Sequence, residues 1–151
     1  MENNVPTTVQ AQPQASVAPA IPLTSNRSLI KFILLNIVTL GIYSLVFYSC
    51  ISNDINAIAG RYDGKKTMHY CLLAFILTPI TLGIAPLVWF HKISARIGAE
   101  LQRRGIEYNF SASTFWLWNI LGSLIIVGPF IYTYKLIIAT NRLAEDYNSK
   151  G

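Results

Sequence analysis

The sequence is poor in charge and in cysteine. Only 13% of its 151 residues are charged, which is about half the share found in a typical soluble domain. The two cysteines, Cys50 and Cys71, lie in or at the edge of apolar stretches, where a small thiol commonly packs as an apolar group. The composition therefore argues against an ordinary soluble domain and against a disulfide framework.

Motifs that carry known chemistry are also missing. The chain has no Gly-x-Ser-x-Gly, no His-Glu-x-x-His and no pair of carboxylates within an apolar stretch. Residues 63–67 are similar to the end of a phosphate-binding loop, but the upstream glycine and strand are absent, so a polar turn explains them better. The sequence predicts no enzyme, no catalytic residue and no cofactor.

Two histidines, His69 and His91, are the only such residues and stand near opposite ends of one apolar stretch. Together with Cys71 they are conceivable metal ligands, but the close ligand spacing of a metal site is missing. We expect polar groups at a membrane interface instead, and no metal.

What the sequence does have is three long stretches without charge. They lie between Lys31 and Asp54, between Lys66 and Lys92, and between Glu107 and Lys135, and hold 22, 25 and 27 residues. A helix of that length covers a hydrocarbon core of about 30 Å. The pattern predicts an all-α integral membrane protein.

The basic residues surround these stretches. The formal net charge is +5, but Lys and Arg form no dense basic run, so nucleic acid is not an expected partner. Cations beside apolar stretches are typical of the cytoplasmic side of a membrane protein. We expect the lipid bilayer as partner, with itself or another membrane protein as further partners.

The first 24 residues differ from the rest. Four of the seven prolines fall within residues 1–24, among Gln, Ala, Val, Thr and Asn. Such a segment buries too little apolar surface to offset its ordering entropy, so we expect a disordered tail. Residues 25–148 form the predicted membrane domain.

This membrane domain repeats a short unit. Residues 39–42 and 81–84 both read Thr-Leu-Gly-Ile, and the similarity extends to both sides. We expect three units, at about 27–60, 67–105 and 113–148, each a helix, a glycine break and a second helix. Gly41, Gly83 and Gly128 are the predicted break glycines, because glycine readily accepts a positive φ.

Two topologies are compatible with these units. If each unit is one kinked transmembrane helix, the twelve Lys and Arg residues divide equally between the two sides of the membrane. If each unit is a re-entrant or thin hairpin, all charged segments lie on one side, as the positive-inside rule favours. Arms of about 13 residues then span only about 20 Å. We favour the hairpins, with the charged loops in the cytoplasm.

Residues 33–43, with the aromatic pair Phe47-Tyr48 and polar Asn53-Asp54, resemble a family of small bacterial membrane proteins. That family is catalogued as domain of unknown function 4234. The resemblance extends over roughly residues 27–146. It implies a multi-pass protein of the bacterial cytoplasmic membrane, and it implies no activity.

Side chains inside and beside the stretches have expected roles. Polar groups should bond backbone atoms near the breaks or bridge helices; they are Asn36, Thr39, Thr78, Thr81, Asn119 and Ser123. Aromatic groups should form interfacial belts; they are Trp89, Trp116, Trp118, Tyr108, Tyr132 and Tyr134. Cytoplasmic cations should face anionic lipid; they are Lys65, Lys66, Arg103 and Arg104.

The function that these features favour is a non-enzymatic membrane protein that acts as an interaction scaffold or shapes the bilayer. A small channel or transporter subunit is the alternative, because repeats often surround a pathway. Ionisable side chains other than His are missing from the three stretches, which counts against ion coupling. A membrane enzyme acting on lipid is the third hypothesis.

Overall fold

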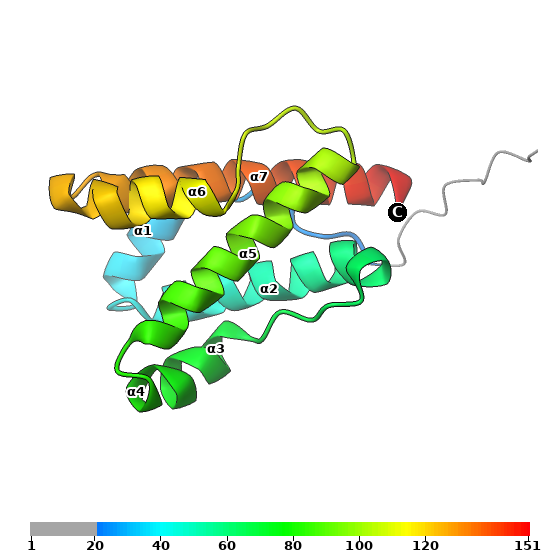
Figure 1. Cartoon of the computed structure of the whole chain (residues 1–151). Coiled ribbons are helices and arrows are strands. Elements are labelled where there is room, and N and C mark those ends of the chain that lie inside the picture. Colours follow the sequence, from blue (N-terminus) through cyan, green and yellow to red (C-terminus); the bar gives the residue numbers. More distant parts are fainter. Residues whose placement is uncertain (1–20) are drawn as a thin grey trace, which may run out of the picture.

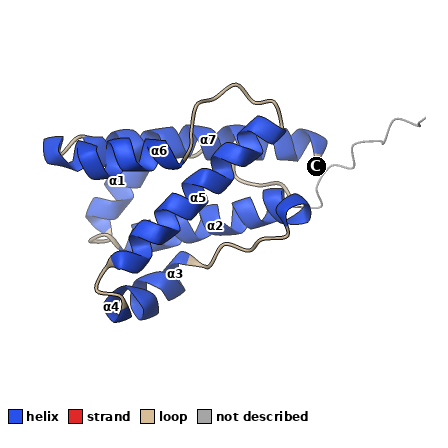
Figure 2. Cartoon of the chain, viewed as in Figure 1, coloured by secondary structure: helices blue, strands red, loops and turns tan. Residues whose placement is uncertain are grey.

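The computed structural model describes residues 21–151, and every regular element within them is helical (Figure 2). The predicted all-α class is confirmed. In chain order the elements are α1 (Leu29–Val38), α2 (Ile42–Asp63), α3 (Tyr70–Leu72), the π-helical η1 (Leu73–Leu77), α4 (Thr78–Ile80), α5 (Ile84–Arg103), α6 (Ala112–Thr114), the π-helical η2 (Phe115–Ile120), the 3₁₀-helical η3 (Leu121–Ile125) and α7 (Gly128–Lys150).

The chain folds back at each break, so that a short helical arm lies against a long helix. α1 packs on α2, the α3–η1–α4 arm on α5, and the α6–η2–η3 arm on α7. Aromatic rings join the two members of each pair. Their centroids are 4.6 Å apart for Phe32 and Phe47, 4.8 Å for Tyr70 and Trp89, and 5.6 Å for Phe115 and Tyr132.

The three long helices α2, α5 and α7 contact one another and form the core. Each begins apolar and becomes charged toward its C-terminal end. Positions that correspond between the repeats are buried together, because each helix presents the same stripe to its neighbours. The buried sets are Phe47, Trp89 and Tyr132, and one turn later Ile51, Ile93 and Leu136.

The molecule has two chemically different ends. The three turns, at residues 39–41, 81–83 and 126–127, lie at the left of Figure 1. The C-terminal ends of α2, α5 and α7 lie to the right. We name these the apolar end and the charged end, because the first carries Leu40, Leu82 and Leu124 and the second Arg61, Arg103, Arg104 and Lys150.

No helix within residues 21–151 is both long enough and apolar enough to pass through a bilayer. Each uncharged stretch is divided between a short arm, a turn and the first part of a long helix. The membrane placement of the hairpins stays a prediction.

Most of the predicted tail, residues 1–20, lies outside the described residues. The extended segment that follows is bound to α7 by two asparagines. Asn148 accepts a hydrogen bond from the Leu23 N–H at 2.7 Å and donates one to the Leu23 carbonyl at 2.8 Å. Asn141 does the same for Arg27, at 3.1 and 2.9 Å. Residues 23–27 are therefore attached to the helical domain.

Candidate functional site

The first two turns share one hydrogen-bonding scheme centred on a threonine. The Thr39 hydroxyl donates to the Leu35 carbonyl at 2.7 Å and accepts from the Tyr43 N–H at 2.9 Å. Thr81 likewise donates to Leu77 at 2.8 Å and accepts from the Ala85 N–H at 2.9 Å. One side chain thus ends one helix and begins the next, satisfying groups that helix ends leave free.

The backbone of these two turns is left-handed. Leu40 and Leu82 both have a φ of 51°, and Gly41 and Gly83 follow with φ values of 91° and 89°. The glycine N–H groups donate to the carbonyls of Asn36 and Thr78 at 2.8 and 2.9 Å. Gly41 and Gly83 therefore lie at the breaks with the positive φ that glycine tolerates best.

The third turn corrects one expectation from the sequence. Gly128 is the first residue of α7 and not the break; the positive φ, 62°, belongs to Ile126. What requires glycine at position 128 is packing. A Cβ there would come within 2.3 Å of the Gly122 Cα and of the Trp118 carbonyl oxygen. Gly122 and Gly128 thus let η3 and α7 approach closely.

Six polar side chains within the uncharged stretches were predicted to bond backbone atoms near the breaks or to bridge helices, and five of them do bond backbone atoms. Thr39 and Thr81 bond the turns as described. Asn36 donates to the Phe32 carbonyl at 2.8 Å, Thr78 to Leu73 at 3.0 Å and Ser123 to Ile120 at 2.5 Å. Their polar atoms are therefore satisfied within the chain, close to the apolar end.

Around these satisfied turns the surface is apolar and exposed. Leu40 and Leu82 are each 93% exposed and Leu124 is 85% exposed. Exposed large apolar side chains occur on both arms of every hairpin: Ile37, Val38, Ile42, Phe75, Ile76, Ile80, Ile84, Leu121, Ile125, Ile126 and Phe130. Large exposed apolar surfaces are rare on soluble monomers and are typical of interaction sites.

The six side chains of the expected aromatic belt differ in burial, and Tyr108 and Trp118 are partly buried against the core. Trp89 and Tyr132 are buried in the core, which corrects their assignment to an interface, because they lie on the faces where the long helices meet. Trp116 and Tyr134 are exposed. Trp116 donates its ring N–H to Nδ1 of His91 at 3.0 Å, linking η2 to α5.

At the charged end, Arg96 joins α2, α5 and the segment between α2 and α3. Its guanidinium bonds Asp63 at 2.6 and 3.0 Å, Asn56 at 2.6 Å, Thr67 at 2.7 Å and the Lys65 carbonyl at 2.5 Å. Hydrogen bonding by Arg96 lowers the pKa of Asp63. Arg96 is thus a structural ion-pair centre.

Arg103 and Arg104, two of the cations expected to face lipid, both bond protein groups. Arg104 is only 5% exposed and bonds Glu100 and Asp146, both at 2.8 Å. Arg103 bonds Glu100 and its guanidinium lies 3.5 Å from the centre of the Tyr62 ring. Both are held by protein groups because α5 ends against α2 and α7.

Hydrogen bonds from basic side chains lower the pKa values of two carboxyl groups at the charged end. Burial acts to raise the pKa of Glu100, but hydrogen bonds from Arg103 and Arg104 outweigh it and the pKa is lowered. Burial likewise acts to raise the pKa of Asp146, and hydrogen bonds from Lys150 and Arg104 lower it. The carboxylates are therefore charged, paired and structural.

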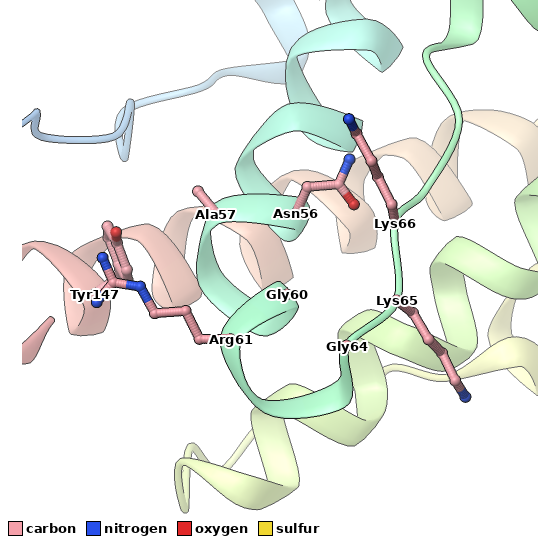
Figure 3. Close-up of a pocket in the computed structure, with 8 residues that line it drawn as sticks. All are labelled: Asn56, Ala57, Gly60, Arg61, Gly64, Lys65, Lys66 and Tyr147. Carbon is pink, nitrogen blue, oxygen red and sulfur yellow. The ribbon is translucent and has the colours of Figure 1, made fainter.

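Lys65 and Lys66 are exposed and border an open pocket of about 480 Å³ at the charged end. Asn56, Gly60, Arg61 and Tyr147 also line it. Figure 3 shows the two lysine side chains pointing in different directions, while Arg61 extends toward Tyr147. The cations do not converge on one point, and they lie where a helix C-terminus attracts positive charge.

Groups with metal-binding chemistry stay apart. Within residues 21–151, no three His, Cys, Asp or Glu side chains gather where they could hold a metal ion. His91 accepts its bond from Trp116, and the Cys71 thiol lies 3.3 Å from the Ser49 hydroxyl. Residues 63–67 form a turn around Asp63 and Gly64, whose φ is 62°.

One family model matches the part of the chain that holds the first two turns. Residues 27–99 match the domain of unknown function DUF4234. The resemblance to this family is confirmed over those residues, just under half of the chain. The DUF4234 segment includes α1, the first two threonine turns and α5 as far as residue 99; the third hairpin lies beyond it. No curated protein and no solved structure matches the chain.

Sequence reasoning missed the residues that hold extended segments onto helices. Asn56 binds the Thr67 backbone through both amide atoms, at 2.6 and 2.8 Å, as Asn141 and Asn148 bind residues 23–27. Asn141 and Asn148 are seven residues apart, which places them on one helix face. That spacing was the available signal, but it does not say which segment they bind.

Proposed function

We propose that this protein is a non-enzymatic membrane protein that inserts its apolar end into the bacterial cytoplasmic membrane and there shapes the bilayer or serves as an interaction scaffold. The observation that carries the proposal is that the three turns lie at one end of the molecule (Figure 1) and that leucines in or beside them are exposed. Leu40 and Leu82 are 93% exposed, and Leu124, in η3 two residues before the third turn, is 85% exposed. The charged end then faces the cytoplasm.

Energetics favour lipid around the apolar end. Burial of an exposed leucine or isoleucine side chain contributes about 1.5–3 kcal/mol, and many such side chains surround the turns. Lipid also requires that backbone groups be satisfied without water. The Thr39 and Thr81 schemes meet this requirement at two of the turns.

The hairpin shape favours a bilayer-shaping role. Three helical pairs that enter from one side of the membrane, with a charged end that stays outside it, displace lipid unequally between its two faces. Three carboxylates near the charged end, Asp63, Glu100 and Asp146, are engaged in ion pairs, and this supports a role without catalysis.

The alternative function, a small channel or transporter subunit, is favoured less by the packing. Where the long helices meet, Phe90 lies 5.0 Å from the Tyr48 ring and 6.0 Å from the Tyr132 ring. Side chains fill this position between α2, α5 and α7. A flux measurement on protein-containing vesicles tests the alternative, and a leak above that of empty vesicles would favour it.

The proposal is tested by charge placed at the apolar end. The triple variant Leu40→Lys, Leu82→Lys, Leu124→Lys should leave the bilayer at alkaline pH and should not change vesicle curvature in electron micrographs. The unaltered chain should stay in the bilayer and should change the curvature. Ile21→Lys is the control for a lysine placed away from the apolar end, because Ile21 is 77% exposed but is next to the segment bound near the C-terminus of α7. Equal membrane retention of the triple variant and the control would overturn the proposal.

A further inference from the structure

Three lysines stand at nearly equal distances from the three turns. Lys31 precedes Leu40 by nine residues, Lys92 follows Leu82 by ten, and Lys135 follows Ile126 by nine. At a rise of 1.5 Å per residue the separation along the helix is about 15 Å at most. Each hairpin thus presents one cation at a similar distance from its turn.

No charged residue lies between any turn and its lysine. All acidic residues of the described chain lie farther from the turns than the lysines do: Asp54, Asp63, Glu100, Glu107, Glu145 and Asp146. The first charge met on leaving the apolar end is therefore positive on all three hairpins.

Within residues 21–151 these three lysines take part in no ion pair, whereas Arg27, Arg96, Arg103, Arg104 and Lys150 all do. Lys31 and Lys92 are exposed and Lys135 is partly exposed. Exposed Trp116 and Tyr134 lie ten residues before and eight residues after Ile126, at a similar distance from that turn. Aromatic rings of this kind favour the headgroup region.

From these positions we infer that the protein enters only one leaflet, with the turns near the bilayer midplane and Lys31, Lys92 and Lys135 bound to lipid phosphates. The inference rests on the proposed function. The hydrocarbon core is about 30 Å thick, so a depth of about 15 Å at most reaches its centre and not the opposite surface. The three lysines form a phosphate-binding ring that sets the depth.

This ring replaces the cations that the sequence assigned to lipid. Arg104 is buried, and Lys65 and Lys66 lie at the far end of the 22-residue α2. A helix of that length extends about 33 Å from its turn. Lys65 and Lys66 are then outside the headgroup region when the turns are at the midplane.

Depth is measured with single nitroxide labels at position 82 in the second turn and at positions 88, 95 and 102 of α5. The full chain lacking Cys50 and Cys71 is reconstituted in phosphatidylcholine vesicles with phosphatidylglycerol. Oxygen accessibility should be greatest at 82, intermediate at 88, near the headgroup value at 95 and lowest at 102. A label at 82 that an impermeant reductant reaches only from the side opposite the charged end would overturn the inference and leave the proposed function standing. A label at 82 that the reductant reaches from the side of the charged end would overturn both.

The ring is tested by lipid preference. The unaltered chain should prefer spin-labelled phosphatidylglycerol over phosphatidylcholine, and the triple variant Lys31→Gln, Lys92→Gln, Lys135→Gln should lose this preference. Each lysine should change the relative affinity for the two lipids by about fivefold at most. The control Lys65→Gln, Lys66→Gln, Lys150→Gln has the same charge change and should keep the preference, as should the Lys→Arg version of the ring. Equal losses in both Gln variants, or a loss in neither, would overturn the ring.

Discussion

Thr81 bonds both helices at the second turn, because its hydroxyl accepts the Ala85 N–H at 2.9 Å while donating to the carbonyl of Leu77. Thr39 repeats the arrangement in the first hairpin with Tyr43 and Leu35. The two turns are therefore equivalent in sequence, backbone and side-chain bonding, which makes them a matched pair for mutagenesis.

Removal of the threonine hydroxyl should weaken the turn. Thr81→Val keeps the side-chain shape but leaves the Ala85 N–H without its acceptor, and loss of a helix cap costs about 1 kcal/mol, up to about 2 where the freed donor is buried. Equilibrium unfolding in micelles measures the free energy of unfolding of the variant and of the unaltered chain. Thr81→Ser retains the hydroxyl and should fall well short of that loss; equal losses for Val and Ser would show that the hydroxyl does not cap the turn.

A methyl group at position 128 should separate η3 from α7. Its Cβ would lie 2.2 Å from the Gly122 carbonyl carbon, so the arms must move apart, which costs about 1–3 kcal/mol. Gly60→Ala is the helical control, because its Cβ meets nothing closer than 3.8 Å and should leave stability unchanged or slightly higher. The free energy of unfolding of both variants tests this prediction. An unchanged free energy for Gly128→Ala would contradict the close approach of η3 and α7.

Loss of Arg96 should loosen the segment between α2 and α3. Arg96→Gln removes the bonds to Asp63, Asn56, Thr67 and the Lys65 carbonyl, and the uncompensated groups cost about 2–3 kcal/mol. Amide hydrogen exchange at Thr67 should become faster, since Asn56 then holds it alone. Arg103→Gln is the control; its side chain is 39% exposed, so the change should cost less than about 1 kcal/mol.

Stability should fall in acid. The pKa values of Asp63, Glu100 and Asp146 are lowered in the folded state. The unfolded chain therefore takes up protons first as the pH decreases, and the stability contributed by these carboxylates is lost between their unfolded and folded pKa values, below about pH 4.5. The thermal midpoint from pH 7 to pH 3 measures this. Asp146→Asn should be less stable at pH 7 and less sensitive to acid; an unchanged pH dependence would contradict the linkage.

Sequence reasoning succeeded where local chemistry decides the outcome. The identical residues at 39–42 and 81–84 predicted two equivalent breaks, and Gly41 and Gly83 have the positive φ expected there. The threonines bond backbone atoms as expected, because a hydroxyl within one helical turn of a free carbonyl finds it without help from distant residues.

Reasoning from sequence failed where a partner distant in sequence decides the environment. Trp89 and Trp116 were both predicted to lie in an interfacial belt, yet Trp89 is buried at 5% exposure and Trp116 is 44% exposed. Arg104 was predicted to be a lipid-facing cation, but Asp146, more than forty residues away, binds it. Gly128 was predicted to be a break glycine, but the close approach of Gly122 is what requires glycine at this position.

By itself, the sequence determined the helical class, the two threonine–glycine turns and the separation of apolar from charged segments, because propensity, capping and hydropathy act within a few residues. Only the tertiary structure decided that the three turns gather at one end, which cations are paired, and which aromatics are buried. These outcomes depend on how α2, α5 and α7 pack, and packing between helices joins residues that no sequence spacing relates.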